Sequence, residues 1–170
     1  MKTPIKSNTM KTLTLSVLFT FLVISLKAQQ VTNFTGTWKR NTDKCDAGNL
    51  SVNSIPISIS VEQSKSQIQI KRVSKSAQGD STAYTEKIKF DDSSVTSGVK
   101  PNLNKSATVA WSIDQKQLIE TANYTDGQGN PMQKVKENWS LSDDGKTLTI
   151  QTIILADGKD YQLTEVFDKK

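Results

Sequence analysis

From residue 55 onward, apolar side chains recur at every second position. Ile55, Ile57, Ile59 and Val61 alternate with proline, serine and glutamate. Successive side chains of a β-strand point to opposite faces, so this pattern predicts strands with one enclosed face. The same alternation returns in seven further segments, at residues 68–72, 84–90, 107–113, 118–124, 135–141, 148–154 and 161–167. With the segment around Trp38, we expect about eight to ten strands.

The links between these segments are short and rich in turn-forming residues. They read DQKQ at 114–117, DGQGNP at 126–131, SDDGK at 142–146 and ADGKD at 156–160. Parallel strands need crossovers of about a dozen residues or more, so these links predict antiparallel neighbours. A meander of many twisted strands tends to close, because closure removes its exposed edges. The predicted fold is therefore all-β, an antiparallel up-and-down meander closing into a barrel, with a loop at residues 41–54.

The N-terminal segment has a different composition. Four lysines surround an apolar run at residues 13–26, and Ala28 follows. This pattern predicts a signal peptide at residues 1–28, followed by one barrel domain at residues 29–170, exported to the periplasm or the extracellular space. An uncleaved anchor is the alternative, although a membrane-spanning helix needs about 20 apolar residues. No cysteine follows the run directly, so we expect no lipid anchor and no membrane span after cleavage.

Removal of the signal peptide changes the charge of the chain. The whole chain has 22 basic and 17 acidic residues, a net charge of +5. Loss of the four lysines leaves 18 basic residues and a net charge of +1. A basic patch for nucleic acid is therefore not expected. Cys45 is the one cysteine, which excludes an intramolecular disulfide, and we interpret it as a loop residue rather than an interchain or reactive thiol.

Several short motifs suggest a relationship. The domain opens with Gly36, Thr37 and Trp38, continues with ENW at 137–139 and LSDDGKTLTI at 141–150, and ends with VFDK at 166–169. Over residues 33–170 it resembles the lipocalin-like domains of the calycin group found in exported bacterial proteins. The resemblance implies a barrel that holds a small apolar or amphipathic molecule, with Trp38 packed across its closed end. Lipocalins usually place an arginine on the last strand against this tryptophan, whereas here that strand reads Glu165, Val166, Phe167.

The glutamates have an unusual distribution. All five lie in predicted strands, whereas almost all aspartates lie in turns, and four of the five share the phase of the apolar residues. Arg72 shares this phase too, and Glu62 does not. An isolated buried carboxylate is costly, so we predict a partly polar cavity for an amphipathic or cationic molecule. The candidate ligand-binding residues are Arg72, Tyr84, Glu86, Trp111, Glu120, Tyr124, Glu137, Trp139 and Glu165.

Two alternatives remain for these side chains. In-phase polar residues at a barrel mouth face solvent, and a β-bulge shifts the phase by one residue. Trp111 and Trp139 share the phase of the core residues, so filling the core is their alternative role.

Catalytic chemistry has little support in the composition. The chain has no histidine, which removes the commonest general base and metal ligand and excludes Ser-His and Cys-His arrangements. The Asp pairs at 91–92 and 143–144 lie where turns favour aspartate and lack the spacing of a calcium loop, so no metal or other cofactor is expected. We predict a monomeric, non-catalytic binding protein. The alternatives are an interaction module of the cell envelope with a filled barrel and a two-carboxylate glycoside hydrolase.

Overall fold

The computed structural model describes residues 31–76, 79–91, 95–100 and 102–170. The predicted signal peptide and residues 29–30 lie outside these ranges. The prediction of an all-β fold is confirmed. The ten strands are β1 (Gly36–Arg40), β2 (Ser58–Gln63), β3 (Gln67–Lys75), β4 (Ser81–Lys89), β5 (Val95–Lys100), β6 (Leu103–Trp111), β7 (Leu118–Asp126), β8 (Pro131–Leu141), β9 (Thr147–Ala156) and β10 (Lys159–Lys169).

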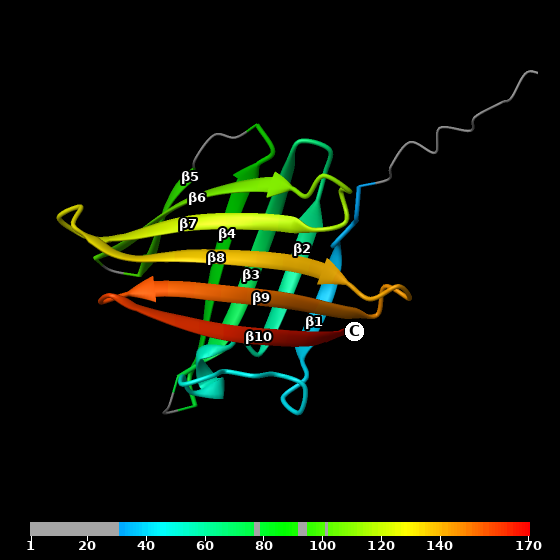
Figure 1. The fold of residues 1–170 in the computed structure, drawn as a ribbon, viewed down its shortest axis with the longest axis horizontal. Helices are drawn as coiled ribbons and strands as arrows, with labels where there is room; N and C mark the ends of the chain where they lie inside the picture. Colours follow the sequence, from blue (N-terminus) through cyan, green and yellow to red (C-terminus); the bar gives the residue numbers. More distant parts are fainter. Residues whose placement is uncertain (1–30, 77–78, 92–94, 101) are drawn as a thin grey trace, which may run out of the picture.

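The strands form one antiparallel sheet that curls into a nearly closed barrel (Figure 1). The hydrogen-bonded order is β4-β3-β2-β1-β10-β9-β8-β7-β6-β5, so chain neighbours are also neighbours in space, and β1 pairs with β10. The order ends at β4 and β5, which places the seam of the barrel between them. Cα atoms of β4 approach those of β5 and β6 within 8 Å at this seam. The predicted up-and-down meander is therefore confirmed.

The turns follow the predicted chemistry. The β9–β10 hairpin reverses at Asp157 and Gly158, whose φ angles are 52° and 69°. A two-residue hairpin with both central φ angles positive matches the twist of its strands, and Asp-Gly is a favoured sequence for it. Among the described residues, no helix is long and apolar enough to cross a bilayer.

Residues 41–54 form the predicted loop, but it extends to residue 57, because β2 begins at Ser58 rather than at residue 55 as expected. It contains one short 3-10 turn, η1 (Val52–Ser54). Arg40 Nη1 donates to the carbonyl oxygens of Val52 (2.8 Å) and Ile55 (2.7 Å), and Asp46 forms a β-bridge with Thr164 of β10. The loop is thereby fixed to the last residue of β1 and to the middle of β10.

An aromatic cluster closes one end of the barrel. It consists of Phe34, Trp38, Trp111 and Trp139, and we call it the aromatic plug. Thr32 donates its N–H to the Gln115 carbonyl (3.1 Å), so the segment before β1 crosses this end. Phe34 is fully buried behind it, stacked on Trp111 at 6.1 Å and edge-on to Trp139 at 6.0 Å between ring centroids. Trp38 is also fully buried and donates its indole N–H to the Phe34 carbonyl at 3.0 Å. This end is therefore a packed hydrophobic core.

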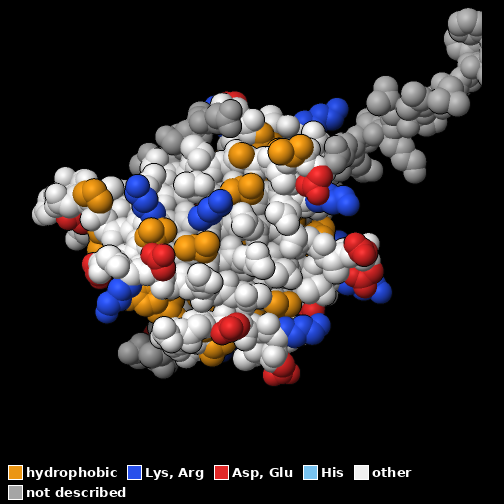
Figure 2. Space-filling model, viewed as in Figure 1, with side chains coloured by type: hydrophobic (Ala, Val, Ile, Leu, Met, Phe, Trp, Pro, Cys, Tyr) orange, Lys and Arg blue, Asp and Glu red, His pale blue; other side chains and the backbone are white. Residues whose placement is uncertain are grey.

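The outer surface carries both signs of charge. On the face formed by β7 to β10, lysine and acidic side chains are scattered among neutral ones (Figure 2). Glu62, expected to face water, is exposed on β2 and accepts a hydrogen bond from Gln69 at 3.2 Å.

Candidate functional site

Four glutamates point into the barrel. Glu86 on β4, Glu120 on β7 and Glu165 on β10 are buried, and the Glu137 side chain on β8 is 14% exposed. Each has an even separation from buried apolar residues of its own strand, which places it on the inner face. The prediction that these four glutamates face the enclosed side is confirmed.

Arg72 of β3 lies at the centre of the acidic side chains. Its guanidinium group bonds Glu86, Glu120 at 3.4 Å and Glu137 at 2.6 Å, from three different strands. Its Cζ atom lies 5.4 Å from the ring centroid of Trp139. One arginine therefore connects β3 to β4, β7 and β8 across the barrel interior.

Lys105 is the second cation inside the barrel. Its side chain is 2% exposed, and its ammonium group bonds Glu86 at 2.7 and 2.9 Å and also bonds Glu120. Lys105 was not predicted from the sequence, because the alternation in this segment was taken to begin at Ala107. Lys105 has the same phase as Ala107 and Val109, and this phase is the sequence signal that marks it as an inward-facing residue. Its bond to Glu86 joins β6 to β4 across the seam of the barrel.

These contacts keep Arg72, Lys105 and Glu120 ionised. Burial disfavours charge on Arg72 and Lys105, but the carboxylates around them overcome it, and both pKa values lie above their ordinary values. Burial likewise opposes ionisation of Glu120, but Lys105 and Arg72 hold its pKa below the ordinary value. Glu137 differs, since burial raises its pKa despite Arg72. We call these six side chains, Arg72, Glu86, Lys105, Glu120, Glu137 and Glu165, the inner charge cluster.

A cavity of about 570 Å³ lies above the cluster. Its walls come from the ends of β3, β7 and β9 and the starts of β4, β6, β8 and β10, which the meander brings to one end of the barrel. It is therefore on the side opposite the aromatic plug. The lining includes five of the predicted ligand-binding residues: Arg72, Tyr84, Tyr124, Glu137 and Glu165.

The other four predicted residues lie beneath or away from the cavity. Glu86 and Glu120 are held by the two cations and do not reach the lining. Trp111 packs at the closed end against Phe34 and, at 5.5 Å, Phe90. Trp139 is fully buried and donates its indole N–H to Glu137 at 2.8 Å. For both tryptophans the structure shows the alternative role of filling the core.

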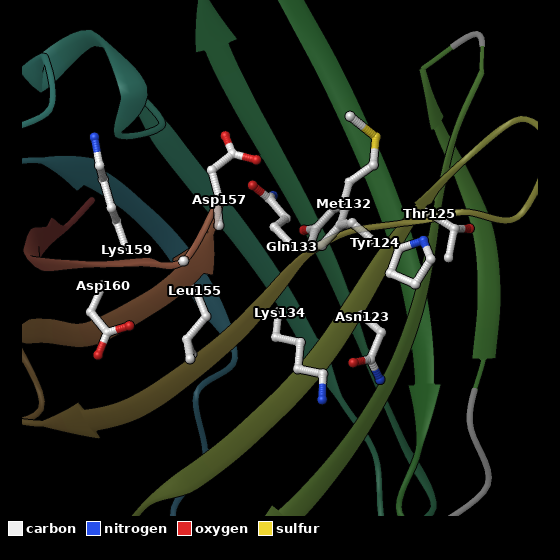
Figure 3. A pocket seen from close by; sticks show the side chains of 13 residues that line it. Asn123, Tyr124, Thr125, Met132, Gln133, Lys134, Leu155, Asp157, Lys159 and Asp160 are labelled. Atoms are coloured by element: carbon white, nitrogen blue, oxygen red, sulfur yellow. The ribbon is translucent and has the colours of Figure 1, made fainter.

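A second hollow of about 600 Å³ adjoins the rim of the barrel (Figure 3). It lies between the β7–β8 and β9–β10 hairpins, with the exposed side chains of Met132 and Leu155 on its walls. It shares Tyr124 and Gln133 with the interior cavity, so the two adjoin. None of the inner charge cluster lines this hollow, and the interior cavity is therefore the better candidate site.

Glu165 differs from the rest of the cluster. It is 7% exposed, and its Oε1 atom accepts a hydrogen bond from Thr152 at 2.8 Å. No described residue forms a salt bridge with it. Burial, and then the negative charge of Glu137, raise the pKa of Glu165 from its ordinary value of 4.5 to about 7.

This shift predicts a dependence of stability on pH. Between about pH 4.5 and pH 7, Glu165 holds a proton in the folded protein that it releases in the unfolded chain. The contribution of this proton to the free energy of unfolding is therefore present below about pH 4.5 and is lost as pH rises to about 7. We expect Glu165→Gln to increase the free energy of unfolding at pH 8 by about 2–3 kcal/mol, with little change at pH 4.5. Urea unfolding of both proteins at the two pH values checks this. An equal effect at both pH values would contradict the assignment.

Cys45 lies in the loop beside β10 and packs against the hydrophobic core. Its Sγ atom accepts from the Val166 N–H at 3.3 Å and lies 3.5 Å from the Val166 carbonyl oxygen. Burial raises the pKa of this thiol, which reduces its thiolate fraction. The geometry favours the interpretation of Cys45 as a loop residue.

Asp144, from the second of the two Asp pairs, has a structural role in a turn. Asp144 Oδ1 accepts from the Ser142 hydroxyl at 2.7 Å and from the Lys146 N–H at 3.0 Å within the β8–β9 turn. Asp92 lies outside the described residues. Within the described ranges, no three acidic or cysteine side chains are grouped as metal ligands.

Comparison of the chain with protein-family models, curated proteins and solved structures finds no match. The lipocalin-like resemblance therefore remains an expectation from the motifs. The all-β barrel and its cavity are features of the structure, and any functional proposal depends on their geometry.

Proposed function

We propose that the protein is an exported, non-catalytic binding protein that holds a small apolar or amphipathic molecule inside its barrel. The observation that carries this proposal is the interior cavity of about 570 Å³ at the end opposite the aromatic plug. Ligand sites for small molecules occupy about 300–1,000 Å³, so the volume is suitable. An interaction module would have a filled barrel, which the cavity argues against.

The cavity wall supports an amphipathic ligand. Its outer part includes the apolar and aromatic side chains Tyr84, Leu103, Tyr124, Val135, Ile154 and Leu163, together with the polar side chains Ser54, Ser74, Thr82 and Gln133. Its deeper part is formed by Arg72, Glu137 and Glu165 from the inner charge cluster. A molecule with an apolar body and one polar end matches this division, because each part would contact surface of its own kind.

Features of the closed end also favour a lipocalin-like carrier. The resemblance expects the Gly-x-Trp tryptophan to lie under a cation of the last strand. Trp38 is fully buried at the closed end, and Lys169 of β10 places its ammonium group 5.2 Å from the Trp38 ring centroid. Lys169 thus occupies the role that the resemblance assigns to an arginine.

The hydrolase alternative has weaker geometry. Glu86 and Glu120 are bonded to Lys105 and do not line the cavity. Glu137 is bonded by Arg72 and Trp139, which leaves Glu165 as the one cavity carboxylate without a salt bridge among the described residues. A glycosidase needs an acid and a second carboxylate that are both free to act on the substrate.

Native mass spectrometry of the protein purified from its own host tests the proposal. We expect an adduct of small-molecule mass that is lost on denaturation. The matched variant is Val135→Phe, which fills part of the cavity wall and should reduce the adduct while circular dichroism stays unchanged. An adduct that persists at full level in the variant would place the ligand elsewhere. Absence of any adduct, together with no uptake of added 1-octanol, would overturn the proposal.

A further inference from the structure

The depth of the cavity holds two carboxylate oxygens that no described donor bonds. Glu165 is more than nine-tenths buried, lines the cavity and is bonded by Thr152 through Oε1. Among the described residues, no donor bonds its Oε2 atom. Glu137 has the same feature, since Arg72 and Trp139 both bond its Oε2 atom and no described donor bonds Oε1. Within the described residues, Asn138 Oδ1 is the one fully buried side-chain oxygen or nitrogen without a hydrogen bond, so the two carboxylate oxygens are open to the cavity and can accept a hydrogen bond from a ligand there.

The charge of the inner cluster is also unbalanced. Arg72 and Lys105 provide two positive charges, and the four glutamates provide four negative charges when all are ionised. Glu86, Glu120 and Glu137 take every salt bridge that the two cations form within the described residues. Glu165 therefore has no counter-ion, and a bound cation would reduce the excess negative charge.

The same contacts disfavour an anionic ligand. Among the described residues, Arg72 is the one cation that lines the cavity, and it already bonds Glu86, Glu120 and Glu137. Lys105 lies beneath the lining, bonded to Glu86 and Glu120. A ligand carboxylate would meet Glu137 and Glu165 at the cost of like-charge repulsion, and it would compete with three glutamates for Arg72.

We propose that the ligand is a protonated amine with an apolar body, whose ammonium group is bonded by Glu165 and Glu137 while its body contacts the wall around Tyr84 and Tyr124. This rests on the proposed function, that the interior cavity binds a small molecule. An ammonium group has three donors and no acceptor, which suits two unpartnered carboxylate oxygens.

The proposal includes a dependence of affinity on pH. The groups that face Glu165 are Glu137 from β8, Arg72 from β3, Thr152 from β9 and the Cys45 thiol from the loop. Burial and Glu137 hold the pKa of Glu165 at about 7, whereas Arg72 stays protonated throughout the accessible range. A primary alkylamine keeps its proton at pH 6 and pH 8, so a change in affinity between them reports the cavity carboxylates, and loss of that change in Glu165→Gln assigns it to Glu165.

The test compares three probes of equal length by isothermal titration calorimetry at pH 8: octylamine, 1-octanol and octanoate. We expect octylamine to bind at least about 10-fold tighter than 1-octanol, because it adds charged hydrogen bonds, and octanoate to bind weakest. Octylamine should bind about 10-fold more weakly at pH 6 than at pH 8, where Glu165 is ionised. The affinity for 1-octanol should not change with pH.

Two variants separate the roles of the carboxylates. Glu165→Gln should bring octylamine close to the affinity of 1-octanol and remove the pH dependence. It keeps an acceptor for Thr152, so the protein should stay folded. Glu62→Gln, on the outer face of β2, is the matched control and should bind all three probes as the parent protein does.

The outcomes distinguish this inference from the proposed function. Equal binding of octylamine and 1-octanol, or tightest binding of octanoate, would overturn the amine proposal and leave the carrier proposal standing. Unchanged octylamine affinity in Glu165→Gln would also overturn it. Binding of none of the probes, with no adduct in native mass spectrometry, would overturn the proposed function itself.

Discussion

Replacing Lys105 by methionine is expected to lower the free energy of unfolding by about 3–5 kcal/mol. The lysine is 2% exposed and is bonded to both Glu86 and Glu120. Its removal would leave two buried carboxylates with Arg72 as their remaining cation. It would also remove a connection between β6 and β4 at the seam of the barrel. Urea unfolding followed by tryptophan fluorescence measures the loss.

Two further variants show whether charge is the cause. Lys71→Met changes an exposed lysine on the outer face of β3 and should alter stability by no more than about 0.5 kcal/mol. Adding Glu120→Gln to Lys105→Met should recover part of the loss, because it removes one uncompensated carboxylate. If the double variant is as unstable as the sum of the single variants, the loss comes from packing rather than from charge.

Replacing Phe34 by alanine is expected to cost about 3–5 kcal/mol of unfolding free energy. Phe34 is fully buried and contacts the rings of Trp111 and Trp139 at the closed end. Truncation would leave a cavity between these rings and admit water to the aromatic plug. Thermal unfolding measures the loss, and tryptophan emission should shift to longer wavelength.

A matched control for this change lies three residues earlier. Val31 is 39% exposed in the same segment, so Val31→Ala should have little effect on stability or emission. A loss in Phe34→Ala no larger than in Val31→Ala would show that the segment before β1 does not close the barrel. Because the plug lies opposite the cavity, ligand affinity in folded Phe34→Ala protein should stay close to that of the parent.

The two ends of the barrel therefore differ in composition and in the role that we propose for each. The closed end is apolar and aromatic, and its contribution to stability comes from burial of Phe34, Trp38 and Trp139. The middle layer is ionic, with Arg72 and Lys105 bonded to carboxylates of separate strands. A buried ionic layer adds little net stability over an apolar one, but it places charge at the floor of the cavity. This charge is the feature on which ligand selection depends in our proposal.

Local patterns in the sequence determined nine of the ten strands, the antiparallel turns and the inward direction of the glutamates, whereas β5 (Val95–Lys100) was not predicted. A strand alternates its side chains between two faces whatever its neighbours are, so the phase of Glu120 with Leu118 and Ala122 is readable from the chain alone. The same rule applies to Lys105, which was not predicted because the alternation in its strand was taken to begin two residues after it, at Ala107. Asp-Gly at residues 157–158 likewise specified its hairpin through local backbone preferences.

Only the tertiary structure decided which of the inward residues meet. Phase gives the face of a strand but not the height of a residue along the barrel, which depends on the register of all ten strands. Register placed Trp111 and Trp139 at the closed end, Glu86 and Glu120 against Lys105, and Tyr84 and Tyr124 at the cavity. It also left Glu165 without a counter-ion, since the two buried cations lie on β3 and β6 and bond carboxylates of β4, β7 and β8. Such pairings join residues up to 65 positions apart, a relation that no local pattern in the sequence contains.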